Sequence, residues 1–270
     1  MNGYFFALIT VICYLISGLL IGLRLFNKEE AKKPARAPGI ALGFLGLLFH
    51  AVVLYQQLIS ESGLSLGFFN SGSLVAWLVL FLVLISSLSK PVENLGIVIL
   101  PLAALSVLLS LRYHSIHLLT PDTPPGLKVH VLTSLLAYSL LSMASVQAIL
   151  LAIQDYHLRH RHPGGFIRAL PPLQTMESLL FEMIGAGFLM LTLALGTGVF
   201  FLEDMFAQRL VHKTVLSLIA WLVFGLLLWG RFKFGWRGKR ALIWTLSGFV
   251  VLMLAYFGSK FVIELVLHSG

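Results

Sequence analysis

Long apolar segments separated by short polar loops recur along the whole chain. Eight of them run for about 17 to 28 residues, the length that a helix needs to cross the hydrocarbon core of a membrane. They lie near residues 3–23, 38–57, 73–89, 95–111, 127–152, 175–201, 212–230 and 240–267. The loops between them are too short to hold a soluble domain. The pattern predicts an all-α, polytopic membrane protein with eight transmembrane helices, in a single integral membrane domain over residues 1–270.

The composition supports this class and excludes others. Hydrophobic residues make up 58% of the 270 residues and charged residues only 11%, so a soluble fold could not cover its apolar surface. The formal net charge of +8 does not indicate nucleic-acid binding, because the basic residues lie in loops between apolar segments. The single cysteine, Cys13, excludes a disulfide pair, a CxxC thiol reductant and a CxxCH haem attachment motif.

The charged loops predict the orientation of the chain. The first segment lacks a basic leader region and a cleavage site, so we interpret it as a retained first helix. Fourteen of the 19 Lys and Arg residues fall in the loops after the first, third, fifth and seventh helices. Since basic loops stay on the cytoplasmic side, both termini are expected outside the cytoplasm, an N-out/C-out arrangement.

Polar residues at membrane depth mark the candidate chemistry, because burying them in lipid is costly. Gly39, Gly43, Gly46 and His50 share one face of the second helix, so His50 is expected to point into the bundle. Glu177, near the start of the sixth helix, is expected to act as a cap. Glu182 lies deeper, and a buried hydrogen bond and a functional role are both open for it.

Four histidines fall in the predicted outer half of the membrane: His50, His130, His212 and His268. Two interpretations fit them. In the first, His130 and His268 supply axial nitrogens to a haem iron, since haem sites are commonly built from histidines between facing helices. In the second, the histidines at the boundary are interfacial side chains that bond to headgroups or water. Lys128, Arg209 and Lys213 lie at a depth where they could meet haem propionates.

The last four helices resemble the cytochrome c assembly protein family, the haem-handling membrane proteins of the CcsA and HemX types. The resemblance rests on HVLTSLLAYSLL (130–141), MESLLFEMIGAGFLMLTLALGTGVFF (176–201), TVLSLIAWLVFGLLL (214–228), GWRGKRA (235–241) and YFGSKFVIELVLHSG (256–270). As a whole the chain is most similar to the YpjD-like branch of this family, which lies in the bacterial inner membrane. The resemblance implies a multi-pass protein of that membrane.

The resemblance also implies site residues. His130 matches the first external histidine of the CcsA type, His268 the second, and His50 an intramembrane histidine. The chain departs from the family where a Trp-rich segment is expected, because LEDMFAQRLVHK stands there and His212 takes the place of a proline. Trp229 occupies the position of a second intramembrane histidine.

Two functional hypotheses follow. The first is a non-enzymatic inner-membrane protein that binds or handles haem at its periplasmic face in cytochrome biogenesis, with His130, His268, His50 and His212 as cofactor-binding residues. The missing Trp-rich segment and the glycine faces of the helices motivate the alternative, a haem-free accessory subunit that binds and regulates another membrane protein or transporter. An intramembrane enzyme that uses Glu182 or the outer histidines has no nucleophile or metal motif to support it.

Overall fold

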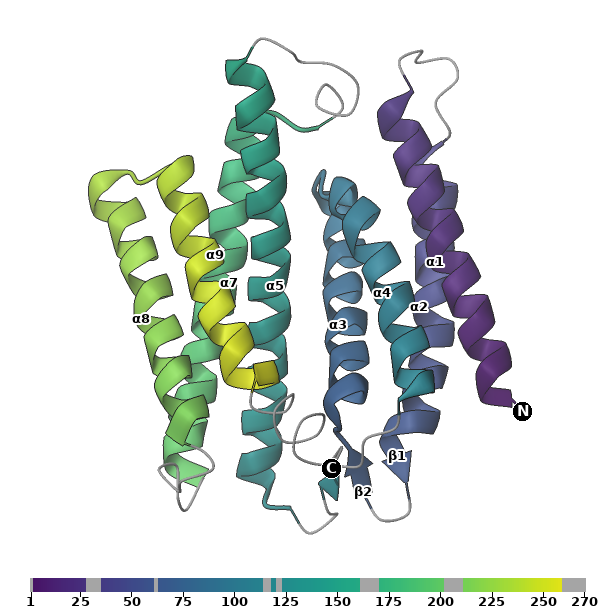
Figure 1. Ribbon diagram of the computed structural model, residues 1–270. Coiled ribbons are helices and arrows are strands. Elements are labelled where there is room, and N and C mark those ends of the chain that lie inside the picture. Colours follow the sequence, from purple (N-terminus) through teal and green to yellow (C-terminus); the bar gives the residue numbers. More distant parts are fainter. Residues whose placement is uncertain are drawn as a thin grey trace. The chain divides into compact units, whose positions relative to one another are not determined.

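The computed structural model describes residues 2–27, 35–60, 63–113, 118–119, 123–160, 170–201 and 211–258. Among these residues, eight helices are long and apolar enough to cross a membrane, which confirms the predicted class (Figure 1). The long helices are α1 (Asn2–Phe26), α2 (Arg36–Leu58), α3 (Phe68–Ser89), α4 (Gly96–Arg112), α5 (Pro125–Arg159), α7 (Leu173–Phe201), α8 (Val211–Phe234) and α9 (Lys239–Met253). A π-helical turn, Leu254–Gly258, continues α9.

The observed helices differ from the predicted bounds by up to five residues at most ends, and by seven at the end of α5. Helix α5 is 35 residues long and continues past residue 152 to Arg159, because helical structure does not have to stop where the apolar segment does. The part of the eighth predicted helix beyond residue 258 lies outside the described residues.

The chain divides into two compact units. Unit 1 comprises residues 1–121 and 156–171, and unit 2 comprises residues 122–155 and 172–270. We call the end of each unit where α1, α3, α5 and α8 begin its outer end, after the predicted orientation, and the opposite end its inner end. That orientation, and the expectation of one membrane domain over 1–270, stay predictions.

In unit 1, helix α1 packs on α2 and α4, and α3 packs on α4 and α2. The glycine face of α2 makes the close approach to α1 possible. A Cβ on Gly46 would lie 2.6 Å from the ring of Tyr14, and one on Gly39 would lie 3.3 Å from Ile21. Helices in membranes associate through such small residues, because close packing has to replace the hydrophobic effect. In lipid, the hydrophobic effect does not favour contacts between helices over contacts with acyl chains. The predicted inward direction of this face is confirmed.

A small antiparallel sheet at the outer end of unit 1 was not predicted. It contains β1 (Ile59–Ser60), β2 (Gly63–Ser65) and β3 (Leu118–Leu119), with Leu64 opposite both Ile59 and Leu119. Gly63 takes a φ of 127°, which favours glycine, where the chain enters β2. The sheet joins the loop after α2 to the loop after α4. Strands of two or three residues are too short to show the alternation of apolar and polar residues from which strands are predicted.

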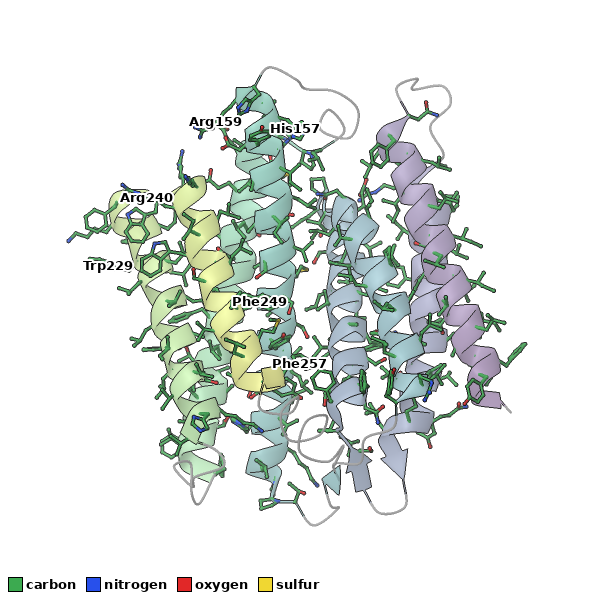
Figure 2. The ribbon with its side chains drawn as sticks, in the orientation of Figure 1. His157, Arg159, Trp229, Arg240, Phe249 and Phe257 are labelled. Carbon is green, nitrogen blue, oxygen red and sulfur yellow. The ribbon has the colours of Figure 1, made fainter. Side chains whose placement is uncertain are left out.

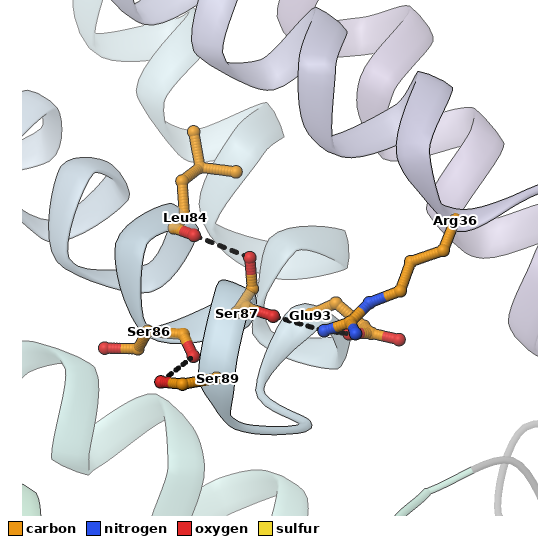
Figure 3. A network of polar contacts seen from close by, with 6 residues as sticks. All are labelled: Arg36, Leu84, Ser86, Ser87, Ser89 and Glu93. Carbon is orange, nitrogen blue, oxygen red and sulfur yellow. Dashed lines mark hydrogen bonds and ion pairs between the residues drawn. The ribbon is translucent and has the colours of Figure 1, made fainter.

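The inner end of unit 1 is held by an ion pair (Figure 3). Arg36, the first residue of α2, lies 2.5 Å from a carboxylate oxygen of Glu93. The same guanidinium donates to the carbonyl oxygen of Ser87 in the last turn of α3. Glu93 belongs to a short 3₁₀ turn, Glu93–Leu95, which leads into α4. The contact therefore fixes the start of α2 against the connection between α3 and α4.

In unit 2, helix α8 packs between α7 and α9. A Cβ on Gly248 of α9 would lie 2.9 Å from the ring of Phe224 on α8, so α9 can approach α8 only because residue 248 is glycine. Helix α5 contacts α9 through Tyr138, whose ring centroid lies 5.6 Å from that of Phe249 and 5.4 Å from that of Phe257 (Figure 2).

Candidate functional site

His130 lies in the second turn of α5 at the outer end of unit 2. The helix begins at Pro125, whose fixed φ and missing N–H suit a first helical turn. The Nδ1 atom of His130 lies 2.8 Å from the carbonyl oxygen of Ala194 on α7. A carbonyl oxygen can only accept, so Nδ1 carries the proton and donates it. In the neutral ring, Nε2 then carries a lone pair.

The carbonyl group of Ala194 on α7 is the main hydrogen-bond acceptor beside His130. The carbonyl oxygen of Ala194 also accepts a hydrogen bond from Thr197 Oγ1 at 3.0 Å, and this hydroxyl lies 3.5 Å from His130 Nδ1. One turn before His130, Gly126 lets the ring of Phe201 approach, since a Cβ on Gly126 would lie 2.3 Å from that ring. Ala194 and Thr197 were not singled out from the sequence. Every residue has a backbone carbonyl group, so the residue type at position 194 does not indicate that its carbonyl accepts a hydrogen bond from His130.

This arrangement suits an axial haem ligand. Histidines that bind metals commonly donate their second ring nitrogen to a carbonyl or carboxylate, which fixes the tautomer and the ring orientation. The imidazole of His130 is partly exposed. In the part of the chain that the structure describes, no three His, Cys, Asp or Glu side chains group as a metal site would require. Haem needs only one or two protein ligands, because the porphyrin fills four positions on the iron.

His212 lies in the first turn of α8 and is exposed. Trp221 of α8 donates to Thr192 of α7 at 2.9 Å, and Arg231, later in α8, contacts Glu177, earlier in α7, so the two helices run antiparallel. Helices α5 and α8 therefore both begin at the outer end of unit 2, and His130 and His212 lie at that same end. The described residues give the ring of His212 no hydrogen bond. His268 lies outside the described residues, and its position relative to His130 stays a prediction.

His50 belongs to unit 1 and has a different environment. Its side chain is fully buried, with 0% exposure, as expected from the glycine face. Nδ1 lies 3.0 Å from the hydroxyl of Tyr14 on α1, and Nε2 lies 2.9 Å from the hydroxyl of Ser73 on α3. Both ring nitrogens are therefore hydrogen-bonded, and neither offers an open lone pair to a metal. In this arrangement His50 links α1, α2 and α3.

The structure corrects the expectation for Glu177 and removes one of the two alternatives for Glu182. Glu177 does not act as a helix cap. Its carboxylate lies 2.9 Å from Arg231 of α8 and 3.8 Å from Arg237 in the turn after α8. It links the inner ends of α7 and α8, because a carboxylate with 12% exposure needs a charged partner. Glu182 is exposed on α7, so it is not a buried hydrogen-bonding group.

Comparisons with known proteins show the family to which the chain belongs. The sequence model of the cytochrome c assembly protein family matches residues 39–267. The inner membrane protein YpjD of Escherichia coli K12 is 33% identical over 267 residues, 97% of this chain and 98% of that protein. A 28.8 kDa protein of Azospirillum brasilense is 34% identical over 147 residues, 53% of this chain and 54% of its own. The cytochrome c biogenesis protein CcsA of Trichormus variabilis is 33% identical over 87 residues, 32% of this chain and 25% of its own. No solved structure matches the chain.

The eight apolar helices of the described residues define a polytopic α-helical membrane protein. The family model covers most of the chain, so the chain belongs to the cytochrome c assembly protein family. It is similar over nearly its whole length to an inner membrane protein, and it is itself a multi-pass protein of the inner membrane.

Proposed function

We propose that this protein binds haem at the outer, periplasmic end of unit 2 and handles it in cytochrome biogenesis. Nε2 of His130 and the imidazole of His268 would hold the haem iron. The observation that carries the proposal is the hydrogen bond of 2.8 Å from His130 Nδ1 to the carbonyl oxygen of Ala194. It holds the ring in the tautomer that a ferrous or ferric iron requires, and it makes Nε2 more basic.

The length of the chain after α9 supports the pairing with His268. Tyr138 lies eight residues from His130 on α5, about 12 Å at the helical rise. Phe257 packs on Tyr138, with ring centroids 5.4 Å apart. His268 follows Phe257 by eleven positions. A helix of that length would span about 16 Å, and a more extended chain would span more. The chain can therefore return from Tyr138 to the level of His130.

The other residues at the outer end of unit 2 complete the proposed site. His212 is exposed on the first turn of α8, where its ring can bond to the haem edge or replace an axial ligand. When bound, haem supplies the iron porphyrin that cytochrome assembly delivers. The chain would orient the imidazoles, and it would meet the propionates with cations at the outer end of unit 2, such as Lys128 in the first turn of α5. The proposal names no catalytic residue, in keeping with a non-enzymatic protein. It leaves His50 out of the site, because both ring nitrogens of His50 are already bonded.

The test is an absorption spectrum of protein purified from native membranes. We expect a Soret band that falls at least tenfold in His130→Ala and that shifts, with a smaller loss of intensity, in His268→Ala. His160→Ala is a matched control, because His160 also places Nδ1 near a backbone carbonyl, Tyr156 O at 2.7 Å, but at the inner end of α5. The proposal fails if wild-type protein lacks the band or if the band is the same in all three variants.

The alternative function, a haem-free accessory subunit that binds another membrane protein, has lost one of its supports. The glycine faces that suggested a partner are used inside the units, with Gly46 against Tyr14 and Gly248 against Phe224. The same purification distinguishes the two functions. A stoichiometric membrane partner that copurifies without any haem would favour the accessory role.

A further inference from the structure

Five basic residues lie at the inner end of unit 2, in the turn between α8 and α9 and in the helix ends on either side of it. Arg231 is committed to the interior, because it lies 2.9 Å from Glu177 and its guanidinium carbon lies 4.5 Å from the centroid of the Phe181 ring. The other four are exposed: Lys233, Arg237, Lys239 and Arg240. Within the part of the chain that the structure describes, Arg237 alone of these four approaches a carboxylate, at 3.8 Å from Glu177. We call these four residues and the exposed rings beside them the basic hairpin.

Large aromatic rings are exposed directly beside these cations. Phe232 is 94% exposed, Phe234 58% and Trp229 53%. A turn that faced only water would not expose such rings next to one another. Aromatic rings beside basic side chains are typical of the membrane interface, where the rings reach the acyl chains and the cations reach the headgroups. The basic hairpin therefore has the side chains that suit a position at headgroup level.

The turn is held in one conformation by its own contacts. Gly235 and Gly238 take positive φ values of 64° and 53°, which close the connection. Trp236 covers Gly230, where a Cβ would lie 2.4 Å from the indole, and it packs on Trp244 with centroids 5.5 Å apart. Figure 2 shows Trp229 and Arg240 at this end of α8 and α9. The cations thus project from a preorganised surface, so a ligand would bind them without first ordering the turn.

We propose that the basic hairpin is a binding surface for anionic phospholipids, with the lipid phosphates held by Lys233, Arg237, Lys239 and Arg240. The excess positive charge selects anionic over zwitterionic headgroups. Each basic residue at a membrane surface contributes roughly a fivefold preference for acidic lipid. The inference does not depend on haem, because the hairpin lies at the opposite end of unit 2 from His130.

The test is native mass spectrometry of the full-length protein in detergent, with phosphatidylglycerol and phosphatidylcholine in competition. Wild-type protein is expected to retain phosphatidylglycerol with at least tenfold preference. A variant with all four residues changed to Gln should lose that preference. Arg112→Gln is the control, because Arg112 is an exposed cation at the outer end of unit 1, where its guanidinium lies 5.3 Å from the Tyr113 ring.

Two further arms keep the test decisive. If the fourfold variant does not fold, Lys239→Gln and Arg240→Gln are measured singly, each with an expected loss of about fivefold. Inorganic phosphate at millimolar concentration should not displace the lipid. Equal retention of the two lipids by wild-type protein, an unchanged preference in the variants, or displacement by free phosphate would each overturn the proposal.

Discussion

The Nδ1 atom of His130 on α5 donates to the carbonyl oxygen of Ala194 on α7, at 2.8 Å. The bond joins two helices that are 64 residues apart in sequence at this point, and it decides which ring nitrogen of His130 is available. A ligand histidine fixed in this way loses little freedom when it binds a metal. The first prediction follows from it.

Removing the second axial ligand should change the haem without removing it from His130. In His268→Ala, residual haem is expected to convert from a six-coordinate low-spin to a five-coordinate high-spin spectrum, because His130 keeps one axial position. Absorption and electron paramagnetic resonance spectra measure the change. The matched variant His130→Ala should release more haem than His268→Ala, since it removes the anchored ligand. An identical low-spin spectrum in His268→Ala would place the second ligand elsewhere.

His50→Ala should destabilise the fold by about 2 to 4 kcal/mol. The substitution leaves the hydroxyls of Tyr14 and Ser73 without partners in a fully buried position and creates a cavity. Unfolding in a graded detergent titration measures the free energy. His212→Ala, at an exposed position, is expected to stay within about 0.5 kcal/mol of wild type. A stable His50→Ala protein that had lost its haem would instead assign His50 to the cofactor.

Gly46→Ala should cost about 1 to 3 kcal/mol, because the added methyl would overlap the ring of Tyr14 at 2.6 Å and push α1 away from α2. Gly185→Ala on α7 is the matched control. Among the described residues, no atom beyond its chain neighbours and the nearby backbone of its own helix lies within 4 Å of a Cβ placed there, so the better helix propensity of alanine should leave stability equal or slightly higher. Thermal unfolding in detergent compares the two, and equal losses would contradict the packing of α1 on α2.

Glu177→Gln should destabilise unit 2 by about 2 kcal/mol, since it leaves Arg231 partly buried without its carboxylate. Arg237 lies 3.8 Å from the same carboxylate and its side chain is 66% exposed, so Arg237→Gln should cost less than about 1 kcal/mol. Denaturation curves of the two variants measure the difference. Equal effects would mean that Arg231 and Arg237 share Glu177 evenly.

The orientation can be tested with a reagent that reacts with thiols and does not cross membranes. The one native cysteine, Cys13, is buried at 6% exposure, so it should remain unlabelled in intact cells. Lys128→Cys at the outer end of unit 2 should be labelled, and Lys239→Cys at the inner end should be labelled only after the membrane is opened. The reverse pattern would contradict the N-out/C-out arrangement and the periplasmic position of the proposed haem site.

The eight helices could be predicted because the bilayer imposes a length on each apolar segment, and that length can be counted along the chain. The inward position of His50 could be predicted for a similar reason, since glycines at helical spacing define one face without knowledge of the neighbour. The sheet of β1, β2 and β3 could not, because it pairs two loops that are distant in sequence.

The sequence by itself determined the class of protein, the number of helices and the identity of the histidines. Only the tertiary structure decided what each histidine can do. His50 has both ring nitrogens bonded to hydroxyls. His130 has one nitrogen bonded to a backbone carbonyl, and the described residues give the other no hydrogen bond. The two histidines therefore differ in what they can bind: His50 has no nitrogen left for a metal, and His130 has one. The reason is physical: hydrogen-bond partners from other helices fix a histidine's tautomer and free nitrogen, and a backbone acceptor such as the Ala194 carbonyl carries no mark in the sequence.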